Sequence, residues 1–453
     1  MRKKFISAMC VGAVALIGVG AGCMALPLRK AVADYSYQET QNGVILTQVN
    51  KAVDGNLVLP SEIDGKAVVE IGSGIFDEVC SITSLTVPQS VQKIAFGAFS
   101  GMKYLEELII PFVGGSANAV GAEKTLGYVF GDTAGSGAYT LQQYSETESA
   151  VYYLPYSLSK INVQGGSLGY GSFYGCKSLQ TVTMSASITE IPAYAFRGTT
   201  ALETVVLPDS TVTIGEKAFY NSSLKTINLD KVQTIEASAF VNTKLTNLTL
   251  TNVQTIGNQA FSGVEKLSAL SLGDCLTAIG DYAFAYCSLL KEVNLPASVA
   301  SVGKGAFYQN LRLAAVNYSG MNLISEDGVL YNADKTQLIV YPAGKTGASF
   351  TLPATVRSIC ENAFNGNKSL KTITVNAETQ EIGYAAFSAC PSLTSLNVYF
   401  HGASASATGA QALLGYVFGE TPFEGCKIEK ATVEGVTYYY CLPANVTVTV
   451  LSV

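Results

Sequence analysis

The sequence predicts a β-rich repeat solenoid, with repeats of 21 to 23 residues, short parallel strands and short helical or irregular turns, interrupted by inserts. Two observations predict this fold class: a phenylalanine that returns at a nearly fixed interval, and an apolar alternation that recurs between successive phenylalanines. The most regular phenylalanines are 23, 23, 21, 21, 23 and 23 residues apart, and they are Phe173, Phe196, Phe219, Phe240, Phe261, Phe284 and Phe307.

Each repeat contains a short strand that has one buried face. In the repeat that ends at Phe219, the apolar residues Leu202, Val205 and Leu207 finish in an alternation of period two, which favours such a strand. The phenylalanine is expected to fill the other side of the coil. Because a single coil cannot enclose its own apolar face, each repeat is stable only when its neighbours cover it.

One repeat follows a longer pattern, Leu-x-x-Val-x-Leu-Pro-x-x-Val-x-x-Ile-Gly-x-x-Ala-Phe, with a valine at the isoleucine position. Its matching residues are Leu290, Val293, Leu295, Pro296, Val299, Val302, Gly303, Ala306 and Phe307. This pattern resembles the repeat of the BspA-type leucine-rich repeat family, and the resemblance covers nearly all of the chain after about residue 40. The resemblance implies a right-handed leucine-rich repeat solenoid, displayed on a surface, that binds other molecules.

Residues 1–33 are predicted to be a secretory signal peptide. The chain begins with three basic residues, carries no charge over residues 5–28, and reaches Ala31-Val32-Ala33, which suits cleavage after Ala33. Residues 5–28 are also long enough to remain as a membrane anchor, and lipidation at Cys23 is a third interpretation. All three alternatives place the repeats outside the cytoplasm, either secreted or on the cell surface.

After the signal, residues 34–75 are expected to form an N-terminal cap and residues 76–453 the solenoid. Inserts are expected at residues 112–170, 318–345 and 400–443. The first and last inserts are two copies of one unit, because Leu-Gly-Tyr-Val-Phe-Gly begins at Leu126 and again at Leu414, each followed 29 residues later by a proline. The middle insert predicts two strands joined by a turn at residues 332–336.

The charge of the chain argues against a nucleic-acid partner. Removal of residues 1–33 would lower Lys plus Arg from 28 to 23 against 34 Asp plus Glu, so the exported chain would carry a charge near −11. Such a surface repels phosphate backbones. No other apolar run is long enough to span a membrane.

The residues that catalysis or metal binding needs are scarce. The chain has one histidine, His401, and it lacks phosphate-binding loops and nucleotide fingerprints. We therefore expect no catalytic residues, no metal and no cofactor, and we expect His401 to be a surface residue. Cys176, Cys287 and Cys390 each follow a repeat phenylalanine by three residues, where other repeats have methionine, threonine or valine. This position predicts a small apolar slot with buried free thiols, although disulfides remain open.

Two sets of residues are candidates for ligand contact. The first set comprises tyrosines of the two paired inserts, because adaptable contact surfaces use tyrosine: Tyr128, Tyr152, Tyr153, Tyr416, Tyr439 and Tyr440. The second set comprises polar residues on the outer face of the strands, which should stack into ladders: Thr181, Thr183, Thr226, Asn228, Asn247 and Thr249. Packing of the inserts and pairing of the strands explain the same residues without a ligand.

These observations predict an exported cell-surface or secreted protein that binds other proteins or glycans, in the manner of an adhesin, and that is not an enzyme. One alternative is a self-associating structural surface protein, because the last strand, around Val446, Val448 and Val450, would leave an open edge. Another is a hydrolase that uses a pair of carboxylates. The ligand, the mode of attachment and the oligomeric state stay open.

Overall fold

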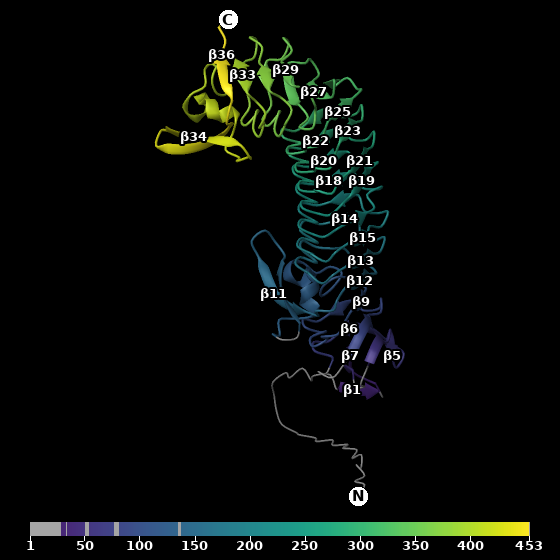
Figure 1. The fold of residues 1–453 in the computed structure, drawn as a ribbon. Helices are drawn as coiled ribbons and strands as arrows, with labels where there is room; N and C mark the ends of the chain where they lie inside the picture. Colours follow the sequence, from purple (N-terminus) through teal and green to yellow (C-terminus); the bar gives the residue numbers. More distant parts are fainter. Residues whose placement is uncertain (1–28, 33, 50–53, 77–80, 135–136, 453) are drawn as a thin grey trace, which may run out of the picture.

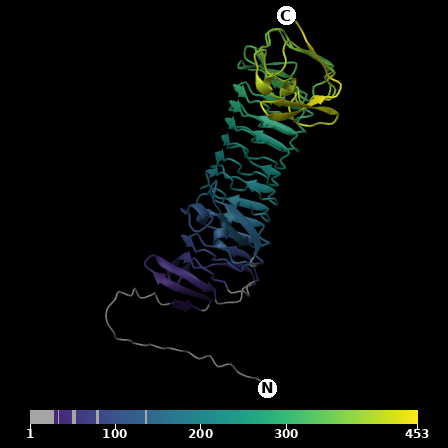
Figure 2. The same ribbon diagram turned by 90° about the vertical axis from the view of Figure 1, so that its left-hand side faces the viewer.

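The chain folds as an elongated β-solenoid that bends in its C-terminal half (Figure 1). The computed structural model describes residues 29–32, 34–49, 54–76, 81–134 and 137–452. Figure 2, turned by 90°, shows the array nearly straight, so the bend lies in the plane of Figure 1. The predicted fold class is confirmed, and helical structure in the described residues is limited to four short 3₁₀ turns. Most of the predicted signal peptide lies outside the described residues.

One side of the solenoid consists of the strands that carry the Leu-x-x-Leu-x-Leu pattern. Neighbouring members pair in parallel within four runs, over residues 54–227, 247–272, 292–318 and 349–450, because each repeat presents the same edge to its neighbour. The apolar residues of each strand point into the core and the intervening ones point outward. These strands are β4 (Asp54–Val58), β7 (Ser81–Thr86), β9 (Glu107–Ile110), β12 (Lys160–Val163), β13 (Thr181–Met184), β15 (Thr204–Val206), β17 (Thr226–Ile227), β19 (Asn247–Leu250), β21 (Ala269–Leu272), β23 (Glu292–Leu295), β25 (Ala315–Tyr318), β29 (Ser349–Thr351), β31 (Thr372–Thr374), β33 (Ser395–Val398) and β36 (Thr447–Val450).

A second side consists of two-residue strands that precede each phenylalanine turn. Neighbouring members pair in parallel over residues 190–302 and again over residues 358–382, and the second residue of each, usually isoleucine, is buried or half-buried. The members are β8 (Lys93–Ile94), β14 (Glu190–Ile191), β16 (Thr213–Ile214), β18 (Thr234–Ile235), β20 (Thr255–Ile256), β22 (Ala278–Ile279), β24 (Ser301–Val302), β30 (Ser358–Ile359) and β32 (Glu381–Ile382).

The third side consists of the phenylalanine turns, whose rings form one continuous stack through the core. From Phe173 to Phe307, neighbouring ring centroids are 4.9–5.9 Å apart and the rings are within 11° of parallel. From Phe173 to Phe284, the backbone N–H of each phenylalanine donates to a carbonyl of the next turn, as from Phe240 to Ala260 at 2.7 Å. Successive repeats are therefore separated along the solenoid axis by about the distance between two hydrogen-bonded strands.

Each phenylalanine turn contains two left-handed backbone positions, two residues before and two residues after the ring. Glycine occupies several of them, such as Gly305 (φ 60°) and Gly198 (φ 73°), as its freedom at positive φ allows. Other turns have larger residues there, such as Tyr282 (φ 55°) and Asn242 (φ 59°). The turn geometry is therefore imposed by stacking on the neighbouring turns and does not depend on glycine.

The N-terminal cap is a small, mostly antiparallel sheet that leads into the first turn. Its strands are β1 (Arg29–Val32), β2 (Tyr35–Thr40), β3 (Gly43–Val49), β5 (Glu62–Ile63) and β6 (Lys66–Ile71), of which β3 pairs with β6 in parallel and β6 continues to β8. The buried Tyr37 donates from its hydroxyl to Asp64 Oδ2 at 2.5 Å. Strand β1 precedes Ala33, so cleavage there would free the outer edge of β2.

The two paired inserts have the same structure. Each has two 3₁₀ turns followed by a β-hairpin: η1 (Gly121–Lys124), η2 (Leu126–Val129), β10 (Ala138–Gln143) and β11 (Ser149–Leu154) in the first, and η3 (Gly409–Ala412), η4 (Leu414–Val417), β34 (Cys426–Val433) and β35 (Val436–Pro443) in the second. Phe130 and Phe418 occupy the phenylalanine position of the stack. The ring centroid of Phe130 lies 6.0 Å from that of Phe99, and the ring centroid of Phe418 lies 6.3 Å from that of Phe387. Each insert is therefore an enlarged repeat within the array.

The middle insert differs from the expected pair of strands, since it forms three: β26 (Leu323–Glu326), β27 (Val329–Asn332) and β28 (Gln337–Val340). The additional turn, at Asp327 and Gly328, has positive φ at both residues, and the expected turn lies between β27 and β28. Tyr341 then takes the phenylalanine position and stacks on Phe364 at 4.9 Å. This insert coincides with the bend, and the hydrophobic core divides here into two clusters.

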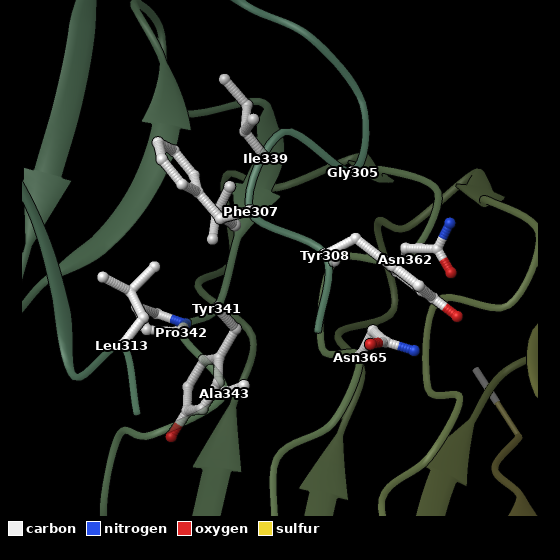
Figure 3. Close-up of a pocket in the computed structure, with 12 residues that line it drawn as sticks. Gly305, Phe307, Tyr308, Leu313, Ile339, Tyr341, Pro342, Ala343, Asn362 and Asn365 are labelled. Atoms are coloured by element: carbon white, nitrogen blue, oxygen red, sulfur yellow. The ribbon is translucent and has the colours of Figure 1, made fainter. Parts of the chain in front are cut away.

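A small cavity of about 10 Å³ lies at this division, enough for about one water (Figure 3). Apolar side chains such as Leu313 and Ile339 line one side of it, and Tyr308, Asn362 and Asn365 line the other. The Asn365 Oδ1 atom is buried and has no hydrogen-bond partner in the described residues. The regular stacking of repeats is therefore interrupted at the bend.

Candidate functional site

The bend gives the solenoid a concave side, and both hairpin inserts lie on it (Figure 1). We call this side the concave turn face; it consists of the phenylalanine turns from Phe173 to Phe387 and the two flanking hairpins. The first hairpin is fixed to the turns by Gln142, which is fully buried. Its Oε1 accepts from the Gly127 N–H at 2.5 Å, and its Nε2 donates to the Tyr174 carbonyl at 3.2 Å.

Two of the candidate tyrosines, Tyr152 and Tyr440, are buried inside the inserts. They are 3% and 2% exposed, and each ring lies directly on a glycine of the 3₁₀ turn, Gly127 and Gly415. Burial raises the pKa of both hydroxyls, that of Tyr440 to about 12. Both side chains therefore hold the hairpins against the 3₁₀ turns and offer no surface to a ligand.

The other candidate tyrosines of the inserts are more accessible. Tyr128 and Tyr416 are half-buried and occupy the same place in the two copies, edge-on against Phe96 (5.4 Å) and Tyr384 (5.3 Å). Tyr153 is half-buried and contacts Tyr139 edge-on at 6.2 Å. Tyr439 is 54% exposed on β35.

The polar ladder lies on the strand side of the solenoid, away from the hairpins (Figure 1). Thr183, Thr226, Asn247 and Thr249 are exposed there, and Thr181 is half-buried. The side chain of Asn228 makes two hydrogen bonds to the backbone of Leu207, at 2.8 and 2.9 Å, and so replaces a missing strand pair. The structure therefore does not bring the ladder and the tyrosines together into one site.

A row of tyrosines on the concave turn face was not among the predicted site residues. They occupy positions two before, one after or two after a repeat phenylalanine, and they are Tyr174, Tyr194, Tyr220, Tyr282, Tyr286 and Tyr308. All are half-buried except Tyr286, which is 48% exposed. The signal was available in the sequence, because residues at equal distance from successive phenylalanines must stack along the same face.

The inside of the bend is closed by polar contacts between repeats that are far apart in sequence. Tyr282 donates to Glu361 Oε1 at 2.5 Å, Asn362 donates to the Tyr282 hydroxyl at 2.9 Å, and Lys304 Nζ lies 3.1 Å from Glu361 Oε2. Burial and the hydrogen bond to Glu361 raise the pKa of Tyr282. Beside this cluster, the rings of Tyr286 and Tyr308 pack edge-on against each other, with their centroids 5.3 Å apart.

A groove lies over the phenylalanine turns beside each of the two paired inserts. The groove at the first hairpin has a volume of about 300 Å³ and includes Tyr139, Tyr174 and Arg197. The groove at the second insert has a volume of about 440 Å³ and includes Leu311 and Phe423. Both grooves are lined by the left-handed residues that lie two positions after successive repeat phenylalanines. The two inserts therefore border the same part of the repeat.

The cysteine slot is more varied than the small apolar slot that the sequence suggested. Cys176, Cys287 and Cys390 are buried free thiols, and burial raises the pKa of Cys390 to about 12. Thr199 and Asn367 occupy the same position in other repeats and donate to backbone carbonyls, as the thiol of Cys287 does to Phe261 at 3.3 Å. The slot therefore selects small side chains that can donate a hydrogen bond, as well as apolar ones.

Three further expectations concern the histidine, metal binding and the N-terminal segment. His401 is exposed. Within the described ranges, no three His, Cys, Asp or Glu side chains are grouped so that they could hold a metal ion. Residues 5–28, the predicted apolar segment of the signal peptide or anchor, lie outside the described residues.

No helix in the part of the chain that the structure describes has the length and apolar character needed to cross a membrane.

Comparisons with known proteins agree with the repeat pattern. The family model described as "BspA type Leucine rich repeat region" matches six copies, over residues 66–116, 146–263, 213–338 and 343–406. No curated protein matches the sequence.

Among solved structures, similar ones include a leucine rich cell surface protein from Faecalibacterium prausnitzii, at 19% identity over 83% of this chain and 77% of that chain, with a TM-score of 0.34. A leucine-rich repeat protein from Eubacterium ventriosum has 24% identity over 58% of this chain and 73% of that chain (TM-score 0.41). The pneumococcal vaccine antigen PcpA has 20% identity over 83% and 74% (TM-score 0.33).

Leucine-rich repeat arrays are in general non-catalytic scaffolds for interaction with other proteins. The family model matches well over half of this chain, and the matched segments contain the stacked phenylalanines described above. The chain therefore belongs to the BspA type leucine-rich repeat family.

Proposed function

We propose that this chain is an exported, surface-displayed or secreted binding protein, adhesin-like in its action, whose concave turn face contacts a protein or glycan ligand. The observation that carries the proposal is the row of accessible tyrosines between two hairpins on the inside of the bend. Tyrosine supplies a large, rigid contact area and a hydroxyl that hydrogen-bonds, at low entropic cost. A concave face also surrounds a ligand on more than one side.

The strand side of the solenoid is a weaker candidate. Its outward residues are small and polar, and part of their hydrogen-bonding capacity is already used, as at Asn228 and between Asn397 and Thr374 (3.1 Å). Such cross-strand contacts stabilise the sheet. The two hairpins, in contrast, extend from the body without adding to the regular array, which favours a role in recognition.

Export and the lack of catalysis belong to the same proposal. The basic start and the apolar residues 5–28 favour export, and the charge near −11 favours a partner other than nucleic acid. Attachment through residues 5–28 and a carboxylate-based hydrolysis stay predictions.

The experiment compares three double variants of the exported protein on one array of matrix proteins and cell-surface glycans. Tyr286→Ala with Tyr308→Ala removes accessible tyrosines of the turns but leaves Tyr282, which holds the bend. Tyr153→Ala with Tyr439→Ala tests the hairpins, and Thr183→Ala with Thr249→Ala tests the ladder. We expect saturable binding that weakens about tenfold or more in the turn variant and stays unchanged in the ladder variant. Loss of binding only in the ladder variant would refute the placement.

A further inference from the structure

We propose that the groove beside the first hairpin binds a carboxylate-bearing sugar, with Arg197 as the group that binds the carboxylate. The inference rests on the proposed function, since the groove is part of the concave turn face, and it adds the chemical class of the ligand.

Arg197 is held between two tyrosines that come from the repeats before and after it. Tyr174, Arg197 and Tyr220 each follow a repeat phenylalanine by one residue, so the solenoid stacks them in one column. The guanidinium carbon lies 5.6 Å from the Tyr174 ring centroid and 5.0 Å from that of Tyr220, with Tyr194 at 5.2 Å to the side. Three cation–π contacts therefore fix the orientation of this side chain.

The N–H groups of this guanidinium are left for a ligand. Among the described residues, no hydrogen bond or ion pair uses the Arg197 side chain, whereas Arg357 pairs with Glu378 at 3.1 Å and Lys217 pairs with Glu216 at 2.5 Å. Tyrosine rings lie near the guanidinium in the repeats before and after it, and they leave its N–H donors unused. A planar edge with parallel donors matches the two oxygens of a carboxylate.

The rest of the groove suits a sugar ring. Tyr139 is 62% exposed and Leu141 is 42% exposed on β10, and both line the groove together with Arg197. Lys177 adds a second positive charge and Asn221 an amide, and the described residues that line the groove include no acidic side chain. Its volume of about 300 Å³ lies at the lower end of ligand pockets. An accessible tyrosine ring beside hydrogen-bond donors is a surface on which a pyranose can stack.

An extended acidic peptide fits this groove less well. Peptides that bind to β structure add their own backbone to a free edge. Here the turn backbone is already paired, because Gly175 N–H donates to the Arg197 carbonyl at 2.8 Å and Gly198 N–H donates to the Tyr220 carbonyl at 2.9 Å. The turns beside Arg197 therefore offer side chains and ring faces, and a peptide could extend only the outer edge of β10, which pairs with β11 alone among the described strands.

Titration calorimetry of the whole exported protein tests the inference with two matched pairs of probes. Sialyllactose is compared with lactose, and oligogalacturonate with its methyl ester, so that each pair differs in its carboxylate. We expect the acidic member of at least one pair to bind at least tenfold more tightly than its neutral partner. Arg197→Ala should weaken that binding at least tenfold, and Arg197→Lys should restore part of it. Arg312→Ala, at an exposed arginine, should have no effect.

The variant Tyr139→Ala keeps the test valid if the loss of Arg197 disturbs the fold, because this residue is 62% exposed and its ring packs against Tyr153 on the hairpin. It should weaken binding of the same probe. Equal binding of neutral and acidic sugars, tighter binding of a polyglutamate peptide, unchanged binding in Arg197→Ala or no binding of either acidic sugar would each overturn the inference. If an array ligand still depended on Tyr286 and Tyr308 in that case, the proposed function would stand without this inference.

Discussion

The continuous phenylalanine stack predicts a large loss of stability when one internal ring is removed. Phe240 is fully buried, and its ring is stacked on Phe219 at 5.2 Å and on Phe261 at 5.1 Å, within 6° of parallel in both pairs. The substitution Phe240→Ala removes both stacks and leaves a cavity between rigid neighbours. Burial of a phenylalanine accounts for about 3–5 kcal/mol, and the two aromatic contacts place this site near the upper limit.

Phe307 provides a matched control at the end of the stack. It has one parallel neighbour, Phe284, at 5.9 Å, and it is adjacent to the small cavity at the bend. Phe307→Ala therefore removes one stack where space already exists, and we expect a loss about 1–2 kcal/mol smaller than for Phe240→Ala. The difference between the two losses of stability therefore measures the contribution of the second ring contact, apart from the burial of the phenylalanine itself.

Equilibrium unfolding in urea measures both variants. The chain contains no tryptophan and 25 tyrosines, so tyrosine fluorescence and circular dichroism are the suitable signals. The free energy of unfolding follows from the midpoint and slope of the transition, and a repeat array can show more than one transition. A loss below about 1 kcal/mol for Phe240→Ala, or an equal loss for Phe307→Ala, would refute the stacking argument.

Three further predictions concern the inserts and the bend. Gly415→Ala should destabilise the second insert by about 2 kcal/mol or more, because the new Cβ would lie 2.1 Å from the Tyr440 ring, and faster proteolysis of the hairpin should report it. Cys426 and Cys441 lie on one face of β34 and β35, two residues out of register, with thiols close enough to hydrogen-bond. Diamide should therefore join them, and peptide mapping without reduction should find the disulfide. Burial, followed by the charge of Asp327, raises the pKa of Tyr341 to about 12. The stability from its neutral form is complete below about pH 10 and is lost as the pH rises through 12, so Tyr341→Phe should reduce the fall of the unfolding midpoint over that range.

Each of these predictions has its own control. Gly165→Ala should speed proteolysis much less, because its Cβ would meet one atom, the Pro111 carbonyl oxygen, at 3.0 Å, and no part of the hairpin. Mapping that finds both Cys426 and Cys441 alkylated after oxidation would contradict the pairing. An equal fall of the midpoint in the wild type and in Tyr341→Phe would show that other groups control the alkaline transition.

The repeat period alone determined the fold class. Phe173 to Phe307 recur because each coil must present the same side chain to its neighbours, so a periodic sequence predicts a periodic stack without knowledge of any distant contact. The same argument would have found the column of Tyr174, Arg197 and Tyr220, whose positions in successive repeats are equal. The two inserts were also recognisable as copies, since Leu126 and Leu414 begin the same motif.

Tertiary structure alone decided which residues of the inserts are accessible. Tyr152 and Tyr153 are adjacent in sequence, but the first lies under the hairpin against Gly127 and the second is half-buried on the opposite face. The bend was equally hidden, because it depends on Tyr282 meeting Glu361, 79 residues further along the chain. A repeat pattern describes contacts between neighbouring coils, which are local and periodic. The bend and the groove beside Arg197 depend on contacts that occur once, where an insert interrupts or overhangs the array, and no period in the sequence encodes them.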